Sequence, residues 1–596
     1  LNSLTQIGGD LTLKNNASLQ NLSALTSLIS INASAIIIEN NDALTSLAGL
    51  DNINPESIVN LILQSSANLS TCDVNSICTY ISSFGSTYTI SGNAAGCNSF
   101  EEVLDACQDT LPQCPSGEEF ILASQEELEH FLVQYPSCTE ITGLLRIRGV
   151  NSNITDLSPL NNITKVGGLV IFSTNLISLD GLENLTTIEG IFDINGNNYL
   201  LNLNGLSNLS NVNGILFLLN NNVLNNIESL SNINTLWGLT ISLNPSLNNL
   251  TGLHNLTSVK WPGQPSNGDV SIRLNPSLTS FEGLNNLAEI DGSMDVVENS
   301  SLNSFDGLNN LLILNGDLRI QDNSALTSIS ALENITDVQG IYGVSYIYVM
   351  GNPSLESLQG LHNITRTAEL NIFDNDSLIN LNGLESLEKV GSAEWMIGDV
   401  YITNNDRLEN LSGLENLNYV YGRLAITGSD LLKNINSLSN LEYVRNLSIT
   451  GNPVLENLTG IENVEMPLTV ESLFLEQNNI LTSCNIPSIC NYLSAGGLNI
   501  ITSNSTGCNS AQEILDLCEL SIEEISDLEE ISFYPVPTKQ ILNIASKSAS
   551  QIEFVKIFDL SGKEVFTSKG NNTRLDISVL PAGTYVVSVK TTKGVH

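Results

Sequence analysis

A short pattern of apolar and polar positions recurs along most of this chain and predicts one structural unit. Each copy begins with two apolar residues separated by a single residue, and further leucines follow, as in GLVIFSTNLISLDGLENLTTIE. The second apolar residue, here called the anchor, occurs at fourteen positions mostly 23 or 24 residues apart: Ile147, Ile171, Ile194, Leu218, Ile241, Ile272, Val296, Ile320, Val349, Ile372, Ile402, Ile426, Ile449 and Leu475. The alternation predicts a short strand, and the later leucines should face inward as the chain turns back. The same unit occurs at Leu13, Ile38 and Leu63, 25 residues apart.

Asparagine occupies one fixed place in this unit. It lies three residues after the anchor in eleven of the fourteen copies: Asn197, Asn221, Asn244, Asn275, Asn299, Asn323, Asn352, Asn375, Asn405, Asn452 and Asn478. If successive strands pair in parallel, these side chains stack and can bond the turning backbone of their own and adjacent coils. We therefore expect a structural ladder. Triplets such as Asn184-Leu-Thr arise from the same consensus and are weak evidence of glycosylation.

The cysteines form one four-residue pattern written twice. Cys72, Cys78, Cys97 and Cys107 are spaced by 6, 19 and 10 residues, and Cys484, Cys490, Cys508 and Cys518 by 6, 18 and 10. Paired cysteines at fixed spacing indicate an oxidising, extracytoplasmic setting. Capping boxes at Ser99 and Ser510 predict short helices, which would hold Cys97 and Cys107 roughly 14 Å apart, too far for a disulfide. The preferred pairs are Cys72 with Cys97 and Cys78 with Cys107, and the crossed pairing remains open.

Two further cysteines, Cys114 and Cys138, bracket another capping box at Ser124. We expect them to pair and to close the N-terminal cap of a second run of repeats. Zinc is the competing interpretation of clustered cysteines, but neither a Cys-x-x-Cys motif nor a nearby pair of histidines is present. No metal site is therefore predicted.

These repeats resemble the leucine-rich L-domain repeats of receptor ectodomains and related bacterial surface proteins, over roughly residues 1–107 and 114–518. The resemblance implies ligand or surface binding. The expected fold is mainly β, a leucine-rich-repeat, L-domain-like parallel solenoid with disulfide-bonded helical caps, followed by a small C-terminal β-sandwich. Residues 1–109 would be the C-terminal part of a first solenoid, and 110–520 a second complete one. Because the chain opens in mid-repeat without a signal peptide, we expect a fragment of a longer secreted precursor.

The composition changes after an acidic linker at 521–531. Three motifs follow in order, Tyr534-Pro-Val-Pro-Thr538, Val555–Lys563 and Leu580–Val589, and they predict short strands of a small sandwich. Residues 532–596 resemble the C-terminal sorting domain of the type IX secretion system of Bacteroidetes-type bacteria. That family usually has Asn where Val536 stands and continues into a last basic strand, which we expect to be missing here. The resemblance implies recognition by the secretion machinery, export across the outer membrane, and a mature body displayed on the cell surface or released.

Charge excludes one class of partner. The chain has 63 acidic and 21 basic residues, a formal net charge of −42. A body this acidic repels phosphate backbones, so nucleic-acid binding is not expected. No run approaches 18 consecutive apolar residues, so no transmembrane segment is predicted either.

Candidates for catalysis are few. The four histidines occupy positions typical of the surface, and Asp295 and Asp317 could approach one another on neighbouring strands as a glycosidase acid pair must. No general acid, base or nucleophile set stands apart from the acidic background. We predict no catalytic residue and no cofactor, with a polysaccharide-degrading solenoid enzyme or a structural filament or surface-layer subunit as alternatives.

Aromatic residues are scarce, but several of them lie on neighbouring strands and in inserted loops. Outward strand positions carry Tyr346, Tyr348, Met350, Phe373 and Tyr401, with Tyr348, Phe373 and Tyr401 expected in one register. Insertions at 259–268, 339–345 and 391–398 carry Trp261, Tyr342 and Trp395. An aromatic floor beside extended loops is a common binding surface on rigid scaffolds. We predict that it binds an extracellular protein or polysaccharide in an adhesin-like role; the alternative is that the loops cover the rings, which then pack internally.

Overall fold

The structure is a computed structural model that divides into two compact units, Leu1–Ile514 and Leu515–His596. It describes all residues except 112–113, 150–152, 264–267, 339–344, 395–396, 469–472, 522–530, 535–537, 539, 547–550, 561, 592–593 and 596. The finer boundaries at residues 110, 521 and 532 stay a prediction.

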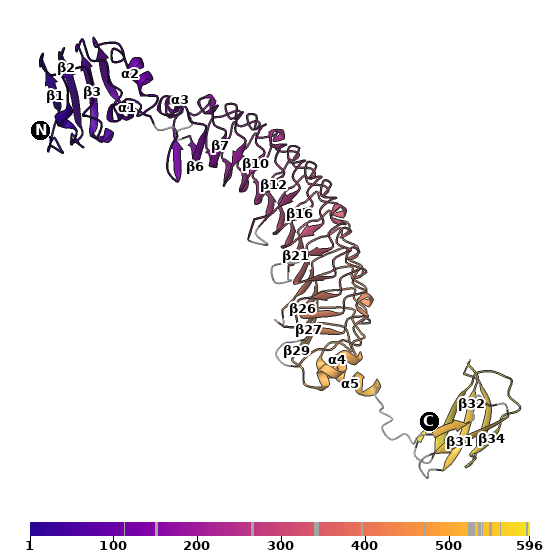
Figure 1. Ribbon diagram of the computed structural model, residues 1–596. Coiled ribbons are helices and arrows are strands. Elements are labelled where there is room, and N and C mark those ends of the chain that lie inside the picture. Colours follow the sequence, from indigo (N-terminus) through magenta and orange to yellow (C-terminus); the bar gives the residue numbers. More distant parts are fainter. Residues whose placement is uncertain are drawn as a thin grey trace. The chain divides into compact units, whose positions relative to one another are not determined.

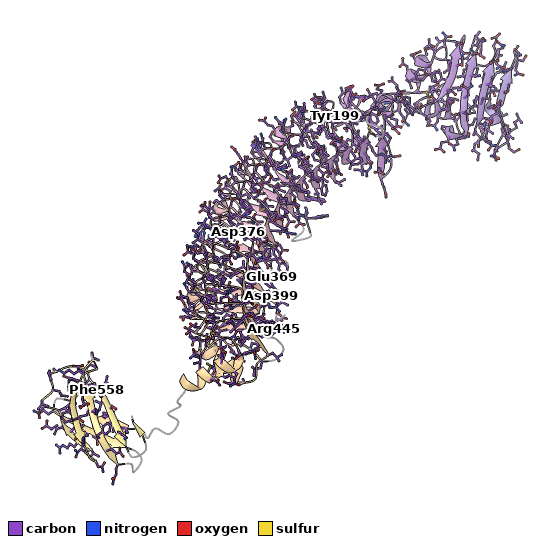
Figure 2. The ribbon with its side chains drawn as sticks, turned by 180° about the vertical axis from the view of Figure 1, so that it is seen from behind. Tyr199, Glu369, Asp376, Asp399, Arg445 and Phe558 are labelled. Atoms are coloured by element: carbon purple, nitrogen blue, oxygen red, sulfur yellow. A yellow bond between two sulfur atoms is a disulfide. The ribbon has the colours of Figure 1, made fainter. Side chains whose placement is uncertain are left out.

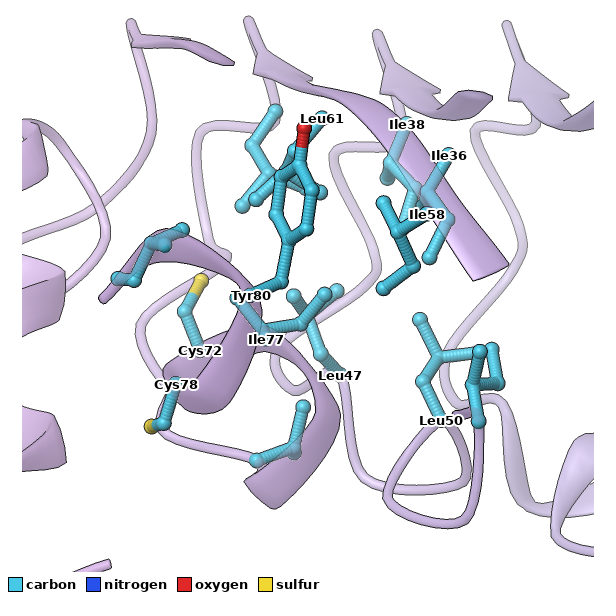
Figure 3. Close-up of a cluster of buried hydrophobic side chains, with 14 of the residues drawn as sticks. Ile36, Ile38, Leu47, Leu50, Ile58, Leu61, Cys72, Ile77, Cys78 and Tyr80 are labelled. Atoms are coloured by element: carbon cyan, nitrogen blue, oxygen red, sulfur yellow. The ribbon is translucent and has the colours of Figure 1, made fainter. Parts of the chain in front are cut away.

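The first parallel sheet has four strands, β1 (Leu11–Lys14), β2 (Ser34–Glu39), β3 (Ile58–Gln64) and β4 (Thr87–Ser91) (Figure 1). Its core joins Ile36, Ile38 and Leu61 to Ile77 and Tyr80 of helix α1 (Asn75–Ile81) (Figure 3). The Tyr80 hydroxyl donates to the carbonyl of Val59 at 2.7 Å. Helix α1 therefore closes the end of this core with a satisfied polar group.

The second parallel sheet has twenty strands and carries the long repeat. Its main strands are β5 (Glu119–Leu122), β6 (Glu140–Arg148), β7 (Lys165–Phe172), β9 (Phe192–Asn195), β11 (Ile215–Leu219), β13 (Gly238–Ser242), β15 (Val270–Arg273), β17 (Met294–Val297), β19 (Leu318–Gln321), β21 (Tyr346–Met350), β23 (Glu369–Phe373), β25 (Val400–Thr403), β26 (Tyr419–Thr427), β27 (Tyr443–Thr450), β28 (Leu473–Glu476) and β29 (Asn499–Thr502). Every anchor from Ile147 to Leu475 is fully buried. The predicted leucine-rich-repeat solenoid is confirmed.

Two-residue strands follow many return stretches. β8 (Thr187–Ile188), β10 (Asn211–Val212), β22 (Arg366–Thr367) and β24 (Lys389–Val390) join the long sheet, while β12 (Thr235–Leu236), β14 (Ser258–Val259), β16 (Glu289–Ile290), β18 (Ile313–Leu314) and β20 (Asp337–Val338) form a narrow sheet of their own. These short strands precede the main strand of their coil.

The return stretch takes one of two forms, set by one residue. Coils with Gly-Leu turn at a left-handed glycine such as Gly283, where φ is 112° and an added Cβ would lie 2.1 Å from the Leu250 carbonyl oxygen. Coils without that glycine make short 3₁₀ turns instead: η1 (Ser23–Leu25), η3 (Ser158–Leu160), η4 (Glu228–Leu230), η5 (Ser330–Leu332) and η6 (Asn436–Leu438). A further 3₁₀ turn, η2 (Pro55–Ser57), follows the left-handed Gly49 in its coil. Glycine is needed where the backbones of adjacent coils touch.

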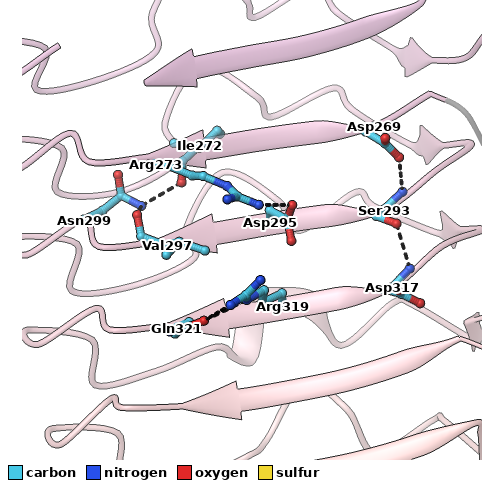
Figure 4. Close-up of polar contacts among 10 residues, drawn as sticks. All are labelled: Asp269, Ile272, Arg273, Ser293, Asp295, Val297, Asn299, Asp317, Arg319 and Gln321. Carbon is cyan, nitrogen blue, oxygen red and sulfur yellow. Dashed lines mark hydrogen bonds and ion pairs between the residues drawn. The ribbon is translucent and has the colours of Figure 1, made fainter. Parts of the chain in front are cut away.

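The predicted asparagine ladder is confirmed, and its members are fully buried. The backbone N–H of Asn275 donates to Asn299 Oδ1 at 3.1 Å. Asn299 Nδ2 donates to the Ile272 carbonyl at 2.9 Å (Figure 4). Each amide thus supplies one acceptor and one donor to the backbone of the preceding coil. The series is interrupted at Ser429, whose hydroxyl has no hydrogen-bond partner.

A second asparagine ladder runs along the return stretches and was not anticipated. Its members donate from Nδ2 to a carbonyl of the preceding coil at 2.6–2.8 Å: Asn184, Asn208, Asn232, Asn255, Asn286, Asn310, Asn334, Asn363, Asn416 and Asn440. Several of these residues begin the Asn-x-Ser/Thr triplets. The triplets therefore have a structural reason to exist.

The helical caps are α1 and α2 (Phe100–Cys107), α3 (Gln125–Gln134), and α4 (Pro487–Ser494) with α5 (Ala511–Ser521). The disulfides join Cys72 to Cys97, Cys78 to Cys107, Cys114 to Cys138 and Cys484 to Cys508, the preferred of the two pairings in the first cap. Cys490 and Cys518 are disulfide-bonded as well, and no cysteine is free. Within the described residues, no helix has the length and apolar character needed to span a membrane.

The second unit contains two antiparallel sheets. One has β30 (Ile531–Tyr534), β31 (Ile541–Ser546) and β34 (Arg574–Asp576); the other has β33 (Glu564–Lys569), β32 (Ile552–Phe558), β35 (Val586–Thr591) and β36 (Gly594–Val595). Their shared core includes Ile544 and Leu575 from the first sheet and Val555 and Val589 from the second. The predicted small β-sandwich is confirmed.

The buried ladder should contribute more to stability than the exposed one. Replacing Asn299 by Ala leaves the Asn275 N–H and the Ile272 carbonyl without their partners, and we expect the free energy of unfolding to fall by about 3 kcal/mol. The matched control, Asn310→Ala on the exposed ladder, should cost about 1 kcal/mol or less because water replaces the lost bond. Denaturant unfolding of both variants measures the difference. Equal losses would show that burial does not separate the two ladders.

Candidate functional site

Outward side chains of the main sheet form three parallel rows. The entry row precedes the first buried residue of each strand, the middle row lies between the buried pair, and the exit row follows the anchor. Across β21, β23, β25 and β26, strand pairing gives the entry row as Tyr346, Glu369, Asp399 and Arg423, the middle row as Tyr348, Asn371, Tyr401 and Ala425, and the exit row as Met350, Phe373, Thr403 and Thr427. The rows decide which side chains can meet.

The predicted aromatic site is only partly brought together. Tyr346 and Tyr348 stack with ring centroids 5.8 Å apart. The expected common register of Tyr348, Phe373 and Tyr401 is wrong, because Phe373 pairs with Met350 in the exit row while Tyr348 and Tyr401 flank Asn371 in the middle row.

The loop aromatics do not join this group in the described structure. Trp261 stacks on Trp237 at 5.8 Å, beside strands that precede β21 by several coils. Trp395 and Tyr342 lie outside the described residues. The part that Tyr346, Tyr348, Met350, Phe373, Tyr401, Trp261 and Trp395 play in binding stays a prediction.

A pocket of about 390 Å³ opens at the entry row. It is lined by Tyr346, Ala368, Glu369, Ile397, Gly398, Asp399, Tyr401, Gly422, Arg423, Arg445 and Asn446, which come from five consecutive coils. Figure 2 marks its position through Glu369, Asp399 and Arg445. The pocket therefore includes two of the predicted aromatic residues and a set of charged residues that the sequence did not single out.

Ile397 and Gly398, at the end of the insertion at 391–398, line one edge of this pocket. The base of the insertion is closed by a bond from the Ser392 N–H to the Ile397 carbonyl at 2.9 Å. Gly391 has φ of 86°, and a Cβ there would lie 1.9 Å from the Ile397 oxygen. Only glycine permits this closure, which holds Ile397 and Gly398 at the pocket edge.

Asp399 positions two other pocket residues. One carboxylate oxygen accepts the backbone N–H of Arg423 at 2.7 Å, and the other accepts the Tyr401 hydroxyl at 2.8 Å. Burial, together with this bond to Asp399, raises the pKa of Tyr401 to about 12. Tyr401 is therefore a neutral phenol with a fixed ring at any physiological pH.

Two polar atoms of the pocket residues are unpartnered. Arg423 Nε and Asn446 Oδ1 are buried and have no hydrogen-bond partner. The Asn446 side chain is only 5% exposed, and its strand β27 pairs Asn446 directly with Arg423 of β26. A buried donor and a buried acceptor without partners are costly unless a ligand supplies them.

Farther along the entry row, the side chains serve the backbone. Asp269 accepts the Ser293 N–H at 2.8 Å, and Ser293 Oγ accepts the Asp317 N–H at 3.1 Å (Figure 4). Asp317 in turn accepts the Tyr346 N–H at 2.9 Å. Asp295 forms an ion pair with Arg273. Both carboxylates considered for an acid pair, Asp295 and Asp317, thus have structural partners. Among the described residues, no group of three or more His, Cys, Asp or Glu is arranged to hold a metal ion.

The sequence missed Glu369, Asp399, Arg423, Arg445 and Asn446. The sequence feature that could have identified these residues is their position just before the buried pair of each strand, close to the inserted loop. The aromatic pattern does not reveal it, because a charged residue in an acidic repeat is typical of ordinary surface.

Comparisons with known proteins bear on the fold and the tail. Residues 532–596 match the family model of the secretion system C-terminal sorting domain. The solved structure described as "Crystal structure of TLR13-ssRNA13 complex" is 15% identical, covers 82% of this chain and 83% of that chain, and has a TM-score of 0.19. At that score the two chains do not superpose as wholes, and the repeat fold rests on the strand register described above. No match was found among curated proteins.

The molecule is thus a secreted leucine-rich-repeat-like protein. Its C-terminal sorting domain marks it for type IX secretion, and proteins of that kind are attached to the cell surface or released. The sorting domain also implies contact with the type IX machinery.

The entry row gives a test of its electrostatics. Burial raises the pKa of Asp317, the Tyr346 N–H opposes the shift, and Asp295 and Asp269 add to it. A raised pKa in the folded state means that protonation favours folding, so stability falls as pH rises through the folded pKa. Asp317→Asn, which resembles the protonated form, should be more stable than the parent at about pH 7, with the gap closing towards about pH 4.

The control for this test is Asp317→Ala, which removes the acceptor of the Tyr346 N–H. It should be less stable than the parent at both pH values. Thermal unfolding of the three proteins across pH measures both effects. A gain for Asp317→Asn that does not change with pH would contradict the electrostatic explanation.

Proposed function

We propose that this protein is an adhesin-like surface protein that binds an extracellular protein or polysaccharide on the strand face of β21–β27. The observation that supports this most is the pocket at the entry row, where Arg423 Nε and Asn446 Oδ1 lack partners. Rigid neighbouring strands hold the pocket residues, so little order must be gained on binding. Display at the cell surface would place this face where extracellular ligands occur.

Binding is favoured over catalysis by the state of the nearest carboxylates. Asp399 uses both oxygens to hold Arg423 and Tyr401, and Glu369 accepts a bond from Asn371 Nδ2 at 2.6 Å. A glycosidase needs one carboxyl group free to protonate the leaving oxygen and a second free to activate water or attack. We therefore propose a binding protein, and hydrolysis of a bound glycan would be the finding that revives the enzyme alternative.

The sorting domain should act in export and not in binding. Deleting residues 532–596 removes a separate two-sheet unit and leaves the solenoid core intact, so the protein should accumulate in the periplasm. Cell fractionation and protease accessibility on whole cells measure the location. The purified deletion variant should bind its ligand as the parent does, and surface display of the variant at the parental level would contradict the prediction.

The middle-row tyrosines should contribute to ligand affinity. Replacing Tyr348 or Tyr401 by Ala should weaken binding by about 1 to 3 kcal/mol, since aromatic anchors carry a large share of interface energy. Probing a glycan and surface-protein array with the full chain identifies the ligand for this measurement. Phe217→Ala is the matched control, because Phe217 occupies the middle row on distant β11. If affinity is kept while melting temperature drops, the rings pack internally and the binding site lies elsewhere.

A further inference from the structure

We infer that the pocket at the entry row binds a short stretch of a neutral polysaccharide. The inference rests on the proposed function and adds the chemical class of the ligand. It is carried by the unpartnered atoms, the fixed aromatic rings and the local balance of charge.

The unpartnered atoms require a ligand that both donates and accepts. Arg423 Nε offers a hydrogen and Asn446 Oδ1 needs one, and the two residues are direct neighbours on paired strands. Paired strands lie about 4.8 Å apart, so both requirements fall within one small ligand group. Neighbouring sugar hydroxyls meet both, since each can donate and accept. A carboxylate can only accept, and an ammonium group can only donate.

The aromatic rings supply apolar faces beside these polar atoms. Tyr401 is fixed by its bond to Asp399 Oδ2, and Tyr346 by stacking on Tyr348. Tyrosine combines an apolar body with a polar tip, and a sugar ring likewise combines an apolar C–H face with hydroxyl edges. Because these rings are already ordered in the protein, binding would cost little side-chain entropy.

Charge distinguishes a neutral glycan from an acidic one. The two arginines of the pocket, Arg423 and Arg445, are matched by Glu369 and Asp399, so the lining carries no formal net charge. The whole chain carries −42. An anionic glycan would meet repulsion from the body without a net attraction in the pocket, whereas a neutral glycan meets neither.

The size of the pocket suits a polymer. Its lining extends from β21 to β27 over five consecutive coils, roughly 19 Å at the spacing of paired strands. A volume of about 390 Å³ lies within the range of ligand sites, and the pocket opens onto the exposed strand face. A chain can therefore continue along the rows on either side of the sugars held in the pocket.

The test uses the full chain and an array of immobilised neutral polysaccharides (α-glucan, β-glucan, mannan and xylan) beside the acidic polymers alginate and pectate. We expect binding to at least one neutral polymer, with affinity changing less than about twofold between about 50 and 500 mM NaCl, because no ion pair with the ligand is involved. Arg423→Met and Asn446→Leu should each weaken that binding by about tenfold or more, the loss expected when one polar partner is removed.

The control is Arg366→Met, because Arg366 is an exposed arginine of β22 outside the pocket lining, and it should bind as the parent does. Melting temperature is measured for every variant, and Arg423→Met carries the test alone if Asn446→Leu does not fold. Binding only to acidic polymers, with steep salt dependence, would overturn the inference.

Two further outcomes separate this inference from the proposed function. A protein ligand that depends on Tyr348 but not on Arg423 would overturn the sugar inference and leave the proposed function standing. No ligand on either the glycan or the protein array would overturn both.

Discussion

The structure depends on how each strand ends inside the protein. After most anchors the chain turns sharply, with left-handed backbone at residues such as Leu274 and Glu298, and the next residue is buried beside polar backbone groups of two coils. A buried N–H and carbonyl must be bonded, and asparagine can serve both from one side chain. The resulting ladder fixes the register of successive strands. That register in turn decides which side chains share a row, and hence that Arg423 and Asn446 meet.

The repeated part of the fold could be predicted from the sequence, and the site could be predicted only in part. The anchors, the buried asparagines and the preferred cysteine pairing in the first cap follow from spacing, because each depends on local geometry that recurs. The row of Phe373 was predicted wrongly, because the alternating pattern shows only that a residue faces outward. It does not separate the middle row from the exit row, which lies two residues farther along the strand. Asp399 could not have been identified, since its role depends on Tyr401 and Arg423 and on a loop that occurs once.

In the pocket, one residue of the repeat takes on a second role beside its structural one. Asp269, Ser293 and Asp317 of the entry row each accept a backbone N–H of the next coil. At Asp399 the same bond is kept, with Arg423 N–H as donor, while the second oxygen orients a phenol. One residue thus maintains the repeat and shapes the site, so changes there would alter both. The sorting domain, with its own core, is free of this coupling.

The interruption of the buried ladder at Ser429 has a mechanical consequence. A solenoid has only nearest-neighbour contacts, so tension along its axis is passed from coil to coil through the same few bonds. Ser429 lies in the coil of β26, which also carries Arg423, and its hydroxyl bonds nothing. At this coil the load therefore falls on the backbone pairing of β26 with β25 and β27 and on the bond from the Ser429 N–H to Asn452 Oδ1.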